Sequence, residues 1–129
     1  MTTAGTIDNV AASEQACFGL IRRYLSYMPQ NVWELPPLGD RSDPVDRCDD
    51  ALRTIVPENR RKPYDMRKVI RSIADADSVF EIQPAFGKAL ITCLARMNGT
   101  VVGFIANNPM IYGGAMDVKG ARKQTHFME

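Results

Sequence analysis

The amino-acid sequence predicts an α/β fold, and three features of the chain support this prediction. Two runs rich in β-forming residues flank the pair Asn98-Gly99, which is the strongest short-range signal for a β-hairpin. Two further stretches, 13–28 and 65–74, repeat their apolar residues at the spacing of a helix. A proline-rich stretch lies between these two helices, so the chain divides into a short first part, a connector and a longer last part.

The first helix is expected over residues 13–28. Ser13 is a suitable N-cap, although Ala16 occupies the position where a capping box has Glu or Gln. Pro29 is expected to end the helix. The wide apolar stripe of this helix requires a partner surface, which either the rest of this chain or sequence outside it supplies. The stripe consists of Cys17, Leu20, Ile21, Tyr24 and Met28, widened by Phe18 and Leu25.

Residues 30–63 are predicted to form a connector. Prolines are concentrated at positions 29, 36, 37, 44, 57 and 63, and the apolar residues between them show no period. Such a stretch buries little surface by itself. Within it, a short helix is expected at 49–55, ended by Pro57. The single tryptophan, Trp33, is expected to be an anchor buried against a domain surface.

The charged residues of the connector do not match a known ligand motif. The aspartates at positions 40, 43, 46, 49 and 50 lack the DxDxDG spacing and the terminal Glu of a calcium loop. The basic run Arg60-Arg61-Lys62 is expected to be a solvated face, and contact with an anionic ligand is the alternative.

The last part begins with a helix predicted over residues 66–74, for which Asp65 is a good N-cap. A short strand at 79–82 follows, and then the hairpin. Its turn is expected to be of type I′, because Asn98 and Gly99 adopt positive φ at low cost. Both arms are expected to be covered on two faces, since 89–97 has no strongly polar face and 101–106 is almost entirely apolar.

A final helix is predicted to begin near Val118, with Asp117 as its N-cap. No Gly, Asn or Pro follows it, so the helical pattern is still in progress where the sequence ends, which indicates a chain cut within a longer protein. Arg122 and Lys123 are expected to be solvated. His126, the only histidine, is expected to be a surface residue, and no metal site is expected.

Composition argues against several classes of protein. The formal net charge of +1 over 129 residues gives no reason to expect nucleic acid or an anionic membrane as a partner. The chain has no apolar run of about 18 residues that would predict a transmembrane helix, and its start lacks the features of a secretory signal. Three cysteines without a CxxC pair indicate reduced thiols and a cytoplasmic protein.

Three stretches of the sequence match the pattern of a known family. They are LSYMPQNVWELPP, DPVDRCDDALRTIVPENRRKPYDMRKVIRSIADADSVFEIQP and LARMNGTVVGFIANNPMIYGGAMDVKGARKQTHFME. They resemble the carboxyltransferase subunits of biotin-dependent acyl-CoA carboxylases, of the propionyl-CoA carboxylase β-subunit type. The α-subunits of related biotin-dependent decarboxylases look similar as well. The resemblance covers the chain from Ile7 onward.

The resemblance implies a partial crotonase-like fold and a carboxyl-transfer activity. Family subunits have two α/β domains of this fold, of which the N-terminal one binds the acyl-CoA and the C-terminal one binds carboxybiotin. Biotin is delivered by a carrier protein or a biotin carboxylase subunit. The subunits form hexamers, and each active site lies between one subunit's first domain and its partner's second. Backbone N–H groups stabilise the thioester enolate and the ureido oxyanion, so no side-chain nucleophile is required.

The resemblance also implies a division of this chain. Residues 1–30 correspond to the closing helix of the N-terminal domain, 31–64 to the connector, and 65–129 to the beginning of a truncated C-terminal domain. Family subunits are several times longer. We therefore expect an internal fragment that is inactive alone, binds no cofactor by itself, and leaves its first helix and hairpin incompletely covered. The alternative is a non-catalytic assembly piece of a split carboxyltransferase or decarboxylase α-subunit.

Candidate site residues follow the hairpin. Gly113 and Gly114 are candidates for backbone oxyanion donors on the biotin side, because they follow a strand and precede a helix N-terminus. The alternative is that two glycines only allow a tight loop. Asn107 and Asn108 either hold the backbone of the loop or line the biotin side. Tyr112 is either an aromatic wall of the pocket or part of the core.

Overall fold

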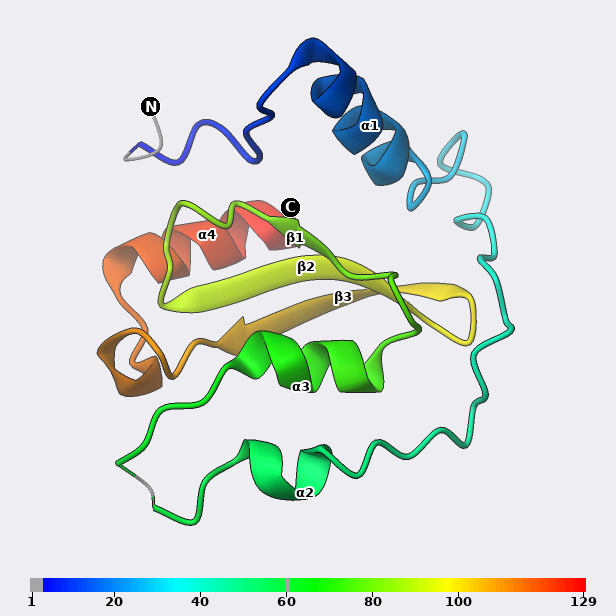
Figure 1. Cartoon of the computed structure of the whole chain (residues 1–129). Coiled ribbons are helices and arrows are strands. Elements are labelled where there is room, and N and C mark those ends of the chain that lie inside the picture. The colour runs from blue at the N-terminus through cyan, green and yellow to red at the C-terminus, as the bar shows by residue number, and fades with distance from the viewer. Residues whose placement is uncertain (1–3, 60) are drawn as a thin grey trace.

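The computed structural model describes residues 4–59 and 61–129 (Figure 1). Arg60, the first residue of the basic run, lies outside the described residues. The elements in chain order are α1 Glu14–Leu25, α2 Leu52–Ile55, α3 Met66–Ile73, β1 Phe80–Ile82, β2 Leu90–Met97, β3 Thr100–Asn107, the 3₁₀ turn η1 Tyr112–Gly114, and α4 Val118–Met128.

The three strands form one antiparallel sheet with β2 in the centre. Successive residues of a strand point to opposite faces. Ile91 and Cys93 pack against Ile70 of α3, whereas the Leu90 side chain lies beside Gly120 of α4. Helices α3 and α4 therefore cover opposite faces of the sheet (Figure 1). This two-sided cover explains why β2 is buried along most of its length.

The predicted hairpin is confirmed. Met97 pairs with Thr100 across the turn, and φ is 50° at Asn98 and 75° at Gly99, as a type I′ turn requires. The Asp75 carboxylate accepts hydrogen bonds from the Asn98 and Gly99 amides at 2.9 and 2.7 Å. The segment that follows α3 therefore fastens the tip of the hairpin.

The expectation that the second arm is covered on both faces is wrong. Phe104 and Ala106 of β3 pack toward α3, but Ile105, on the other face, is 41% exposed. The reason is the position of α4, which lies mainly over β2 and reaches β3 at Gly103, beside the Phe127 ring, so that Ile105 stays partly exposed. In addition, β3 is an edge strand, so only one of its sides is paired within the described residues.

Helix α1 begins as predicted, with the Ser13 hydroxyl accepting a hydrogen bond from the Ala16 amide at 3.2 Å. It ends at Leu25, before Pro29, and Ser26 caps its end with a hydroxyl that donates to the Arg23 carbonyl. None of its residues is buried. The large side chains of the apolar stripe are 42–58% exposed at Phe18, Ile21, Tyr24 and Leu25. The expected incomplete cover of this helix is confirmed.

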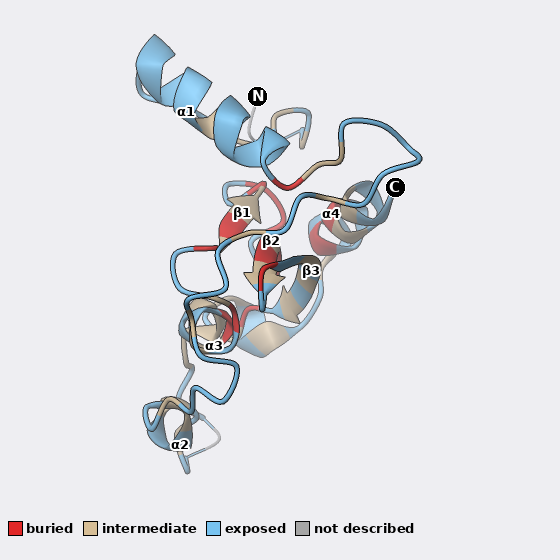
Figure 2. Cartoon of the chain, turned by 90° about the vertical axis from the view of Figure 1, so that its right-hand side faces the viewer, coloured by how far each residue is buried: buried red, intermediate tan, exposed pale blue. Residues whose placement is uncertain are grey.

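Within the described residues, α1 is docked on the rest of the chain at its C-terminal end. Tyr27, just after the helix, is buried, and its ring stacks on Phe80 with centroids 6.1 Å apart. The Tyr27 hydroxyl donates to the Ser78 carbonyl. Arg96 of β2 donates to the Ser26 carbonyl at 2.6 Å. Figure 2 shows the result: buried residues gather around the sheet, whereas α1 and α2 are largely exposed.

The prediction that Trp33 is a buried anchor is wrong, since this residue is 92% exposed. Hydrogen bonds attach the connector to the rest of the chain at several points. The Gly39 amide donates to the Gly99 carbonyl at 2.8 Å, and Arg47 donates to the Ala74 carbonyl at 2.6 Å. A segment held in this way offers the indole no apolar surface to cover it. The predicted helix at 49–55 is the shorter α2.

The caps of the last two α-helices are confirmed. The Asp65 carboxylate accepts from the Arg67 amide at 3.0 Å, and the Asp117 carboxylate accepts from the Gly120 amide at 2.7 Å. Among the helices described, none has the length and apolar character needed to span a bilayer.

Candidate functional site

The loop between β3 and α4 contains three consecutive residues with left-handed backbone. φ is 49° at Tyr112, 64° at Gly113 and 88° at Gly114. Glycine adopts this region readily, whereas a residue such as Tyr112 does so at a cost of about 1–3 kcal/mol. Strain of this kind gathers at ligand-binding loops, so the loop is a site candidate on conformational grounds.

The two glycines differ in what their amides do. The Gly114 N–H donates to the Ile111 carbonyl at 2.9 Å, which closes the tight turn. Within residues 4–59 and 61–129, the Gly113 N–H makes no hydrogen bond, and a Cβ built on Gly113 meets nothing within 4 Å. Of the two glycines, only Gly113 has a free amide, and the space beside its Cα is open. Its role as an oxyanion donor stays a prediction.

A cavity of about 470 Å³ lies on the glycine side of the loop. Gly113 and Gly114 form one wall, and the end of the connector with the start of α3 forms the other. Arg61 and Lys62 bring two positive charges to this wall, which suits an anionic group. Among the described residues, the lining consists of Arg61, Lys62, Pro63, Tyr64, Met66, Ala106, Asn107, Pro109, Gly113 and Gly114.

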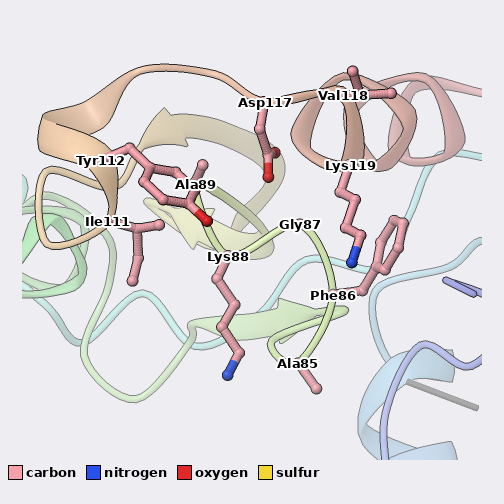
Figure 3. A pocket seen from close by; sticks show the side chains of 10 residues that line it. All are labelled: Ala85, Phe86, Gly87, Lys88, Ala89, Ile111, Tyr112, Asp117, Val118 and Lys119. Carbon is pink, nitrogen blue, oxygen red and sulfur yellow. The ribbon is translucent and has the colours of Figure 1, made fainter. Parts of the chain in front are cut away.

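A second cavity, of about 590 Å³, lies on the opposite side of the loop. Figure 3 shows Tyr112 and Asp117 on the loop side, facing the turn of residues 85–89. Lys119 lies beside the ring of Phe86 in the same view. Tyr112 and the two glycines therefore line different cavities, although they are neighbours in the sequence.

Asn108 and Tyr112 differ in exposure. Asn108 is buried, its side-chain amide donates to the Lys88 carbonyl at 2.8 Å, and its backbone amide donates to the Ala89 carbonyl at 2.9 Å. These contacts hold the loop, and it is Asn107 that borders the glycine-side cavity. Tyr112 is 74% exposed, so it is a cavity wall and not part of the core.

The expectation that Lys123 is solvated is wrong. Lys123 is only 1% exposed, and its ammonium donates to the Leu90 carbonyl at 2.9 Å. Burial lowers the pKa of Lys123 to about 8. The sequence does carry a signal for this position, because Lys123 shares the buried face of α4 with Gly120 and Phe127 at helical spacing. The prediction failed because a lysine on the sheet-facing side of a helix is usually expected to extend its ammonium into solvent.

Three other titratable groups, Cys93, Arg67 and His126, have surroundings that the structure defines. Burial raises the pKa of the Cys93 thiol to about 11, so it stays protonated at neutral pH. Arg67 makes two hydrogen bonds to Glu81, at 2.8 and 2.6 Å. His126 is an exposed residue of α4, as expected, 3.1 Å from Asp8. The described part of the chain contains no group of three or more His, Cys, Asp or Glu placed to hold a metal ion.

Comparison with known proteins identifies the family. The model of the carboxyl transferase domain matches residues 1–129. Over 127 residues the chain is 35% identical to the methylmalonyl-CoA decarboxylase subunit alpha of Veillonella parvula, covering 98% of this chain and 25% of that protein. Over 108 residues it is 38% identical to the propionyl-CoA carboxylase beta chain of Roseobacter denitrificans, covering 84% and 21%.

Solved structures agree with this family. The chain superimposes on the transcarboxylase 12S core, a hexamer assembly with methylmalonyl-CoA and methylmalonic acid bound, with a TM-score of 0.92 and 32% identity. The match covers 98% of this chain and 24% of that one, so the chain spans about a quarter of the length of its relatives. The chain therefore belongs to the carboxyl transferase domain family, and its α/β structure is part of the crotonase-like carboxyltransferase fold.

Proposed function

We propose that this chain forms part of the biotin side of a carboxyltransferase that moves a carboxyl group from carboxybiotin to a propionyl-CoA-like acyl-CoA. The observation that carries the proposal is the free amide of Gly113. It lies on a strand-to-helix loop, makes no hydrogen bond within the described residues, and belongs to a glycine that lines a cavity together with Arg61 and Lys62. An amide held in this way stabilises an oxyanion without reorganisation during the reaction.

The residues present fit a biotin ring in one respect. When bound, biotin supplies the transferable carboxyl group, attached to a ureido ring whose oxygen needs a hydrogen-bond donor. The Gly113 N–H is such a donor, and the absence of a Cβ leaves room for the ring to approach it. Arg61 and Lys62 attract the carboxylate by charge. The cavity is open, and we propose that the chain alone does not retain the cofactor.

The division of the chain is part of the same proposal. Residues 1–30 close an acyl-CoA-binding domain, 31–64 connect, and 65–129 begin the biotin-binding domain. The exposed apolar stripe of α1, against the buried sheet of the last part, supports this division. Acyl-CoA is then bound mainly by sequence that this chain does not cover, within a homo-oligomer that receives biotin on a carrier subunit. Three cysteines that form no disulfide support a cytoplasmic setting.

A second candidate function is that of a non-catalytic assembly piece, of a split carboxyltransferase or of a decarboxylase α-subunit. The observation that favours it is the uncovered surface: α1 buries none of its residues, and the α4-side face of β3 is open at Ile105. Apolar surface of this extent is typical of a surface that receives other chain segments.

The experiment that separates these candidates is a carboxyl-transfer assay with methylmalonyl-CoA and free biotin. The purified chain is assayed alone and after mixing with the segments of a carboxyltransferase relative that it does not cover. We expect no transfer by the chain alone and measurable transfer by the mixture. Transfer by the chain alone would contradict the proposed division of labour. A stable mixed complex without transfer would favour the assembly piece.

A further inference from the structure

The ammonium group of Lys123 occupies a position that a strand would otherwise fill. The Asn108 amide donates to the Ala89 carbonyl, so the backbone groups of Ala89 face β3. Bonding direction alternates along a strand, so the Leu90 carbonyl faces the β1 side. There β1 stops short, because its last residue, Ile82, pairs with Thr92.

Lys123 fills this gap in the ladder. Its ammonium lies 2.9 Å from the Leu90 carbonyl and is shut off from solvent. A buried carbonyl without a donor costs free energy, and a charged donor makes the stronger hydrogen bond. The helix α4 is thereby tied to the first residue of β2. Gly120 packs on the Leu90 side chain from the same helix and reinforces this contact.

The tie has a consequence for the loop that carries Gly113. Three successive carbonyls, those of Lys88, Ala89 and the first β2 residue Leu90, are held by Asn108 and by Lys123 of α4. Asn108, at the beginning of the loop, holds the first two. Lys123, in the helix that follows the loop, holds the third. The beginning of the loop and the helix that follows the loop are therefore fastened to one three-residue segment.

We propose that Lys123 is a positioning residue that sets the geometry of the Gly113–Gly114 loop by clamping α4 to the start of β2. This inference rests on the proposed function of that loop, since it specifies how the candidate oxyanion donor is held. Lys123 itself lies in the protein interior and lines neither cavity next to the loop.

Hydrogen exchange on the isolated chain, followed by mass spectrometry, tests the proposal. The variant Lys123→Met keeps an unbranched side chain that reaches as far as Cε and removes the ammonium. The loop peptide 108–117 is expected to exchange about tenfold faster, while peptides from β2 and β3 keep their protection. Arg122→Met, an exposed neighbour on α4, is the matched control and is expected to change neither.

The outcomes are distinct. A loop that keeps its protection in Lys123→Met overturns the proposal, and so does equal loosening of the loop and the hairpin, which is the result of a purely structural role. If Lys123→Met does not fold, hydrogen exchange of the loop is compared between Lys123→Arg and Lys123→Gln instead. Arginine still reaches the Leu90 carbonyl and keeps the loop protected, whereas the shorter glutamine loosens it. Equal protection in these two variants overturns the proposal.

This experiment contains neither biotin nor acyl-CoA, so it is independent of the proposed activity. A complemented wild-type mixture without carboxyl transfer would remove the proposed function and leave the exchange result intact. Conversely, transfer by the mixture together with an unchanged loop in Lys123→Met would remove only the role of Lys123.

Discussion

Helices α1 and α3 begin in the same way but are packed differently. Each has a side-chain N-cap, Ser13 in one and Asp65 in the other, and each carries an apolar stripe. Helix α3 buries Ile70 against the sheet, whereas α1 buries none of its residues. An apolar stripe at helical spacing predicts a helix, but it does not indicate which surface covers that stripe. The sheet region has a packed core, whereas the apolar side of α1 is not covered by the rest of the described chain.

The difference is greatest for isoleucines in the two regions. Ile91 of β2 is 1% exposed within the core, and Ile21 of α1 is 48% exposed. We expect Ile91→Ala to lower the free energy of unfolding by about 2–5 kcal/mol, and Ile21→Ala to change it by no more than about 0.5 kcal/mol. Urea denaturation measures both. Equal effects would mean that α1 is packed as well as the sheet.

Arg96 joins the two regions and offers a way to separate them. It donates to the Ser26 and Pro37 carbonyls at 2.6 and 2.7 Å and stacks over Tyr27. Loss of such hydrogen bonds costs about 1–3 kcal/mol. We expect Arg96→Met to speed hydrogen exchange around residues 26–39 and to leave β3 protected. The exposed Arg22→Met is the control, and loosening of β3 in Arg96→Met would show that the regions do not separate.

The pH dependence of stability reports on the packed region. Lys123 has a pKa of about 8 when folded and 10.5 ordinarily, so above pH 8 the unfolded chain keeps a proton that the folded chain has released. The free energy of unfolding then rises with pH. Cys93 acts in the opposite direction, because its folded pKa is about 11 against an ordinary 9.0. Its contribution is present below pH 9 and is lost toward pH 11.

We therefore expect the urea midpoint to rise between about pH 8 and pH 9 and to flatten above that, where the two groups oppose each other. Lys123→Met should lack the rise. A wild-type midpoint that falls steadily from pH 8 would show that the ammonium is not disfavoured by the fold.

The smallest effect on stability is expected on the open face of α1. Phe18 is 52% exposed, and the isolated chain should bind an apolar fluorescent dye through this face. Phe18→Ser is expected to reduce dye binding and self-association with little change in the urea midpoint. Unchanged dye fluorescence would place the bare surface elsewhere.

Local signals in the sequence predict local structure well here. Asn98-Gly99 predicts the hairpin turn, and Asp65 and Asp117 predict two helix starts, because each signal acts through the backbone of its immediate neighbours. Residues whose environment depends on distant segments are the ones predicted wrongly. Trp33 is exposed because no apolar surface covers that part of the connector, and Lys123 is buried at the place where β1 is too short to pair with Leu90.

The candidate site follows the same division. The position of Gly113 and Gly114 between a strand and a helix is readable in the sequence. The difference between their amides cannot be predicted from the sequence, because it depends on which of the two N–H groups donates to the Ile111 carbonyl. The pairing of this loop with Arg61 and Lys62 across a cavity also depends on the fold, because those residues are far apart from it in the chain.

The most direct test of the central claim replaces one backbone N–H group by an ester oxygen. The chain has a cysteine at position 93, so a synthetic peptide of residues 93–129 can be joined there by native chemical ligation. With glycolic acid in place of Gly113, an ester replaces the amide and the free N–H is lost. In the complemented assembly, carboxyl transfer is predicted to fall about 10²–10³-fold. The matched ester at Gly114, whose N–H is already committed to Ile111, is predicted to have a much smaller effect. Unchanged transfer with the ester at Gly113 would contradict the account.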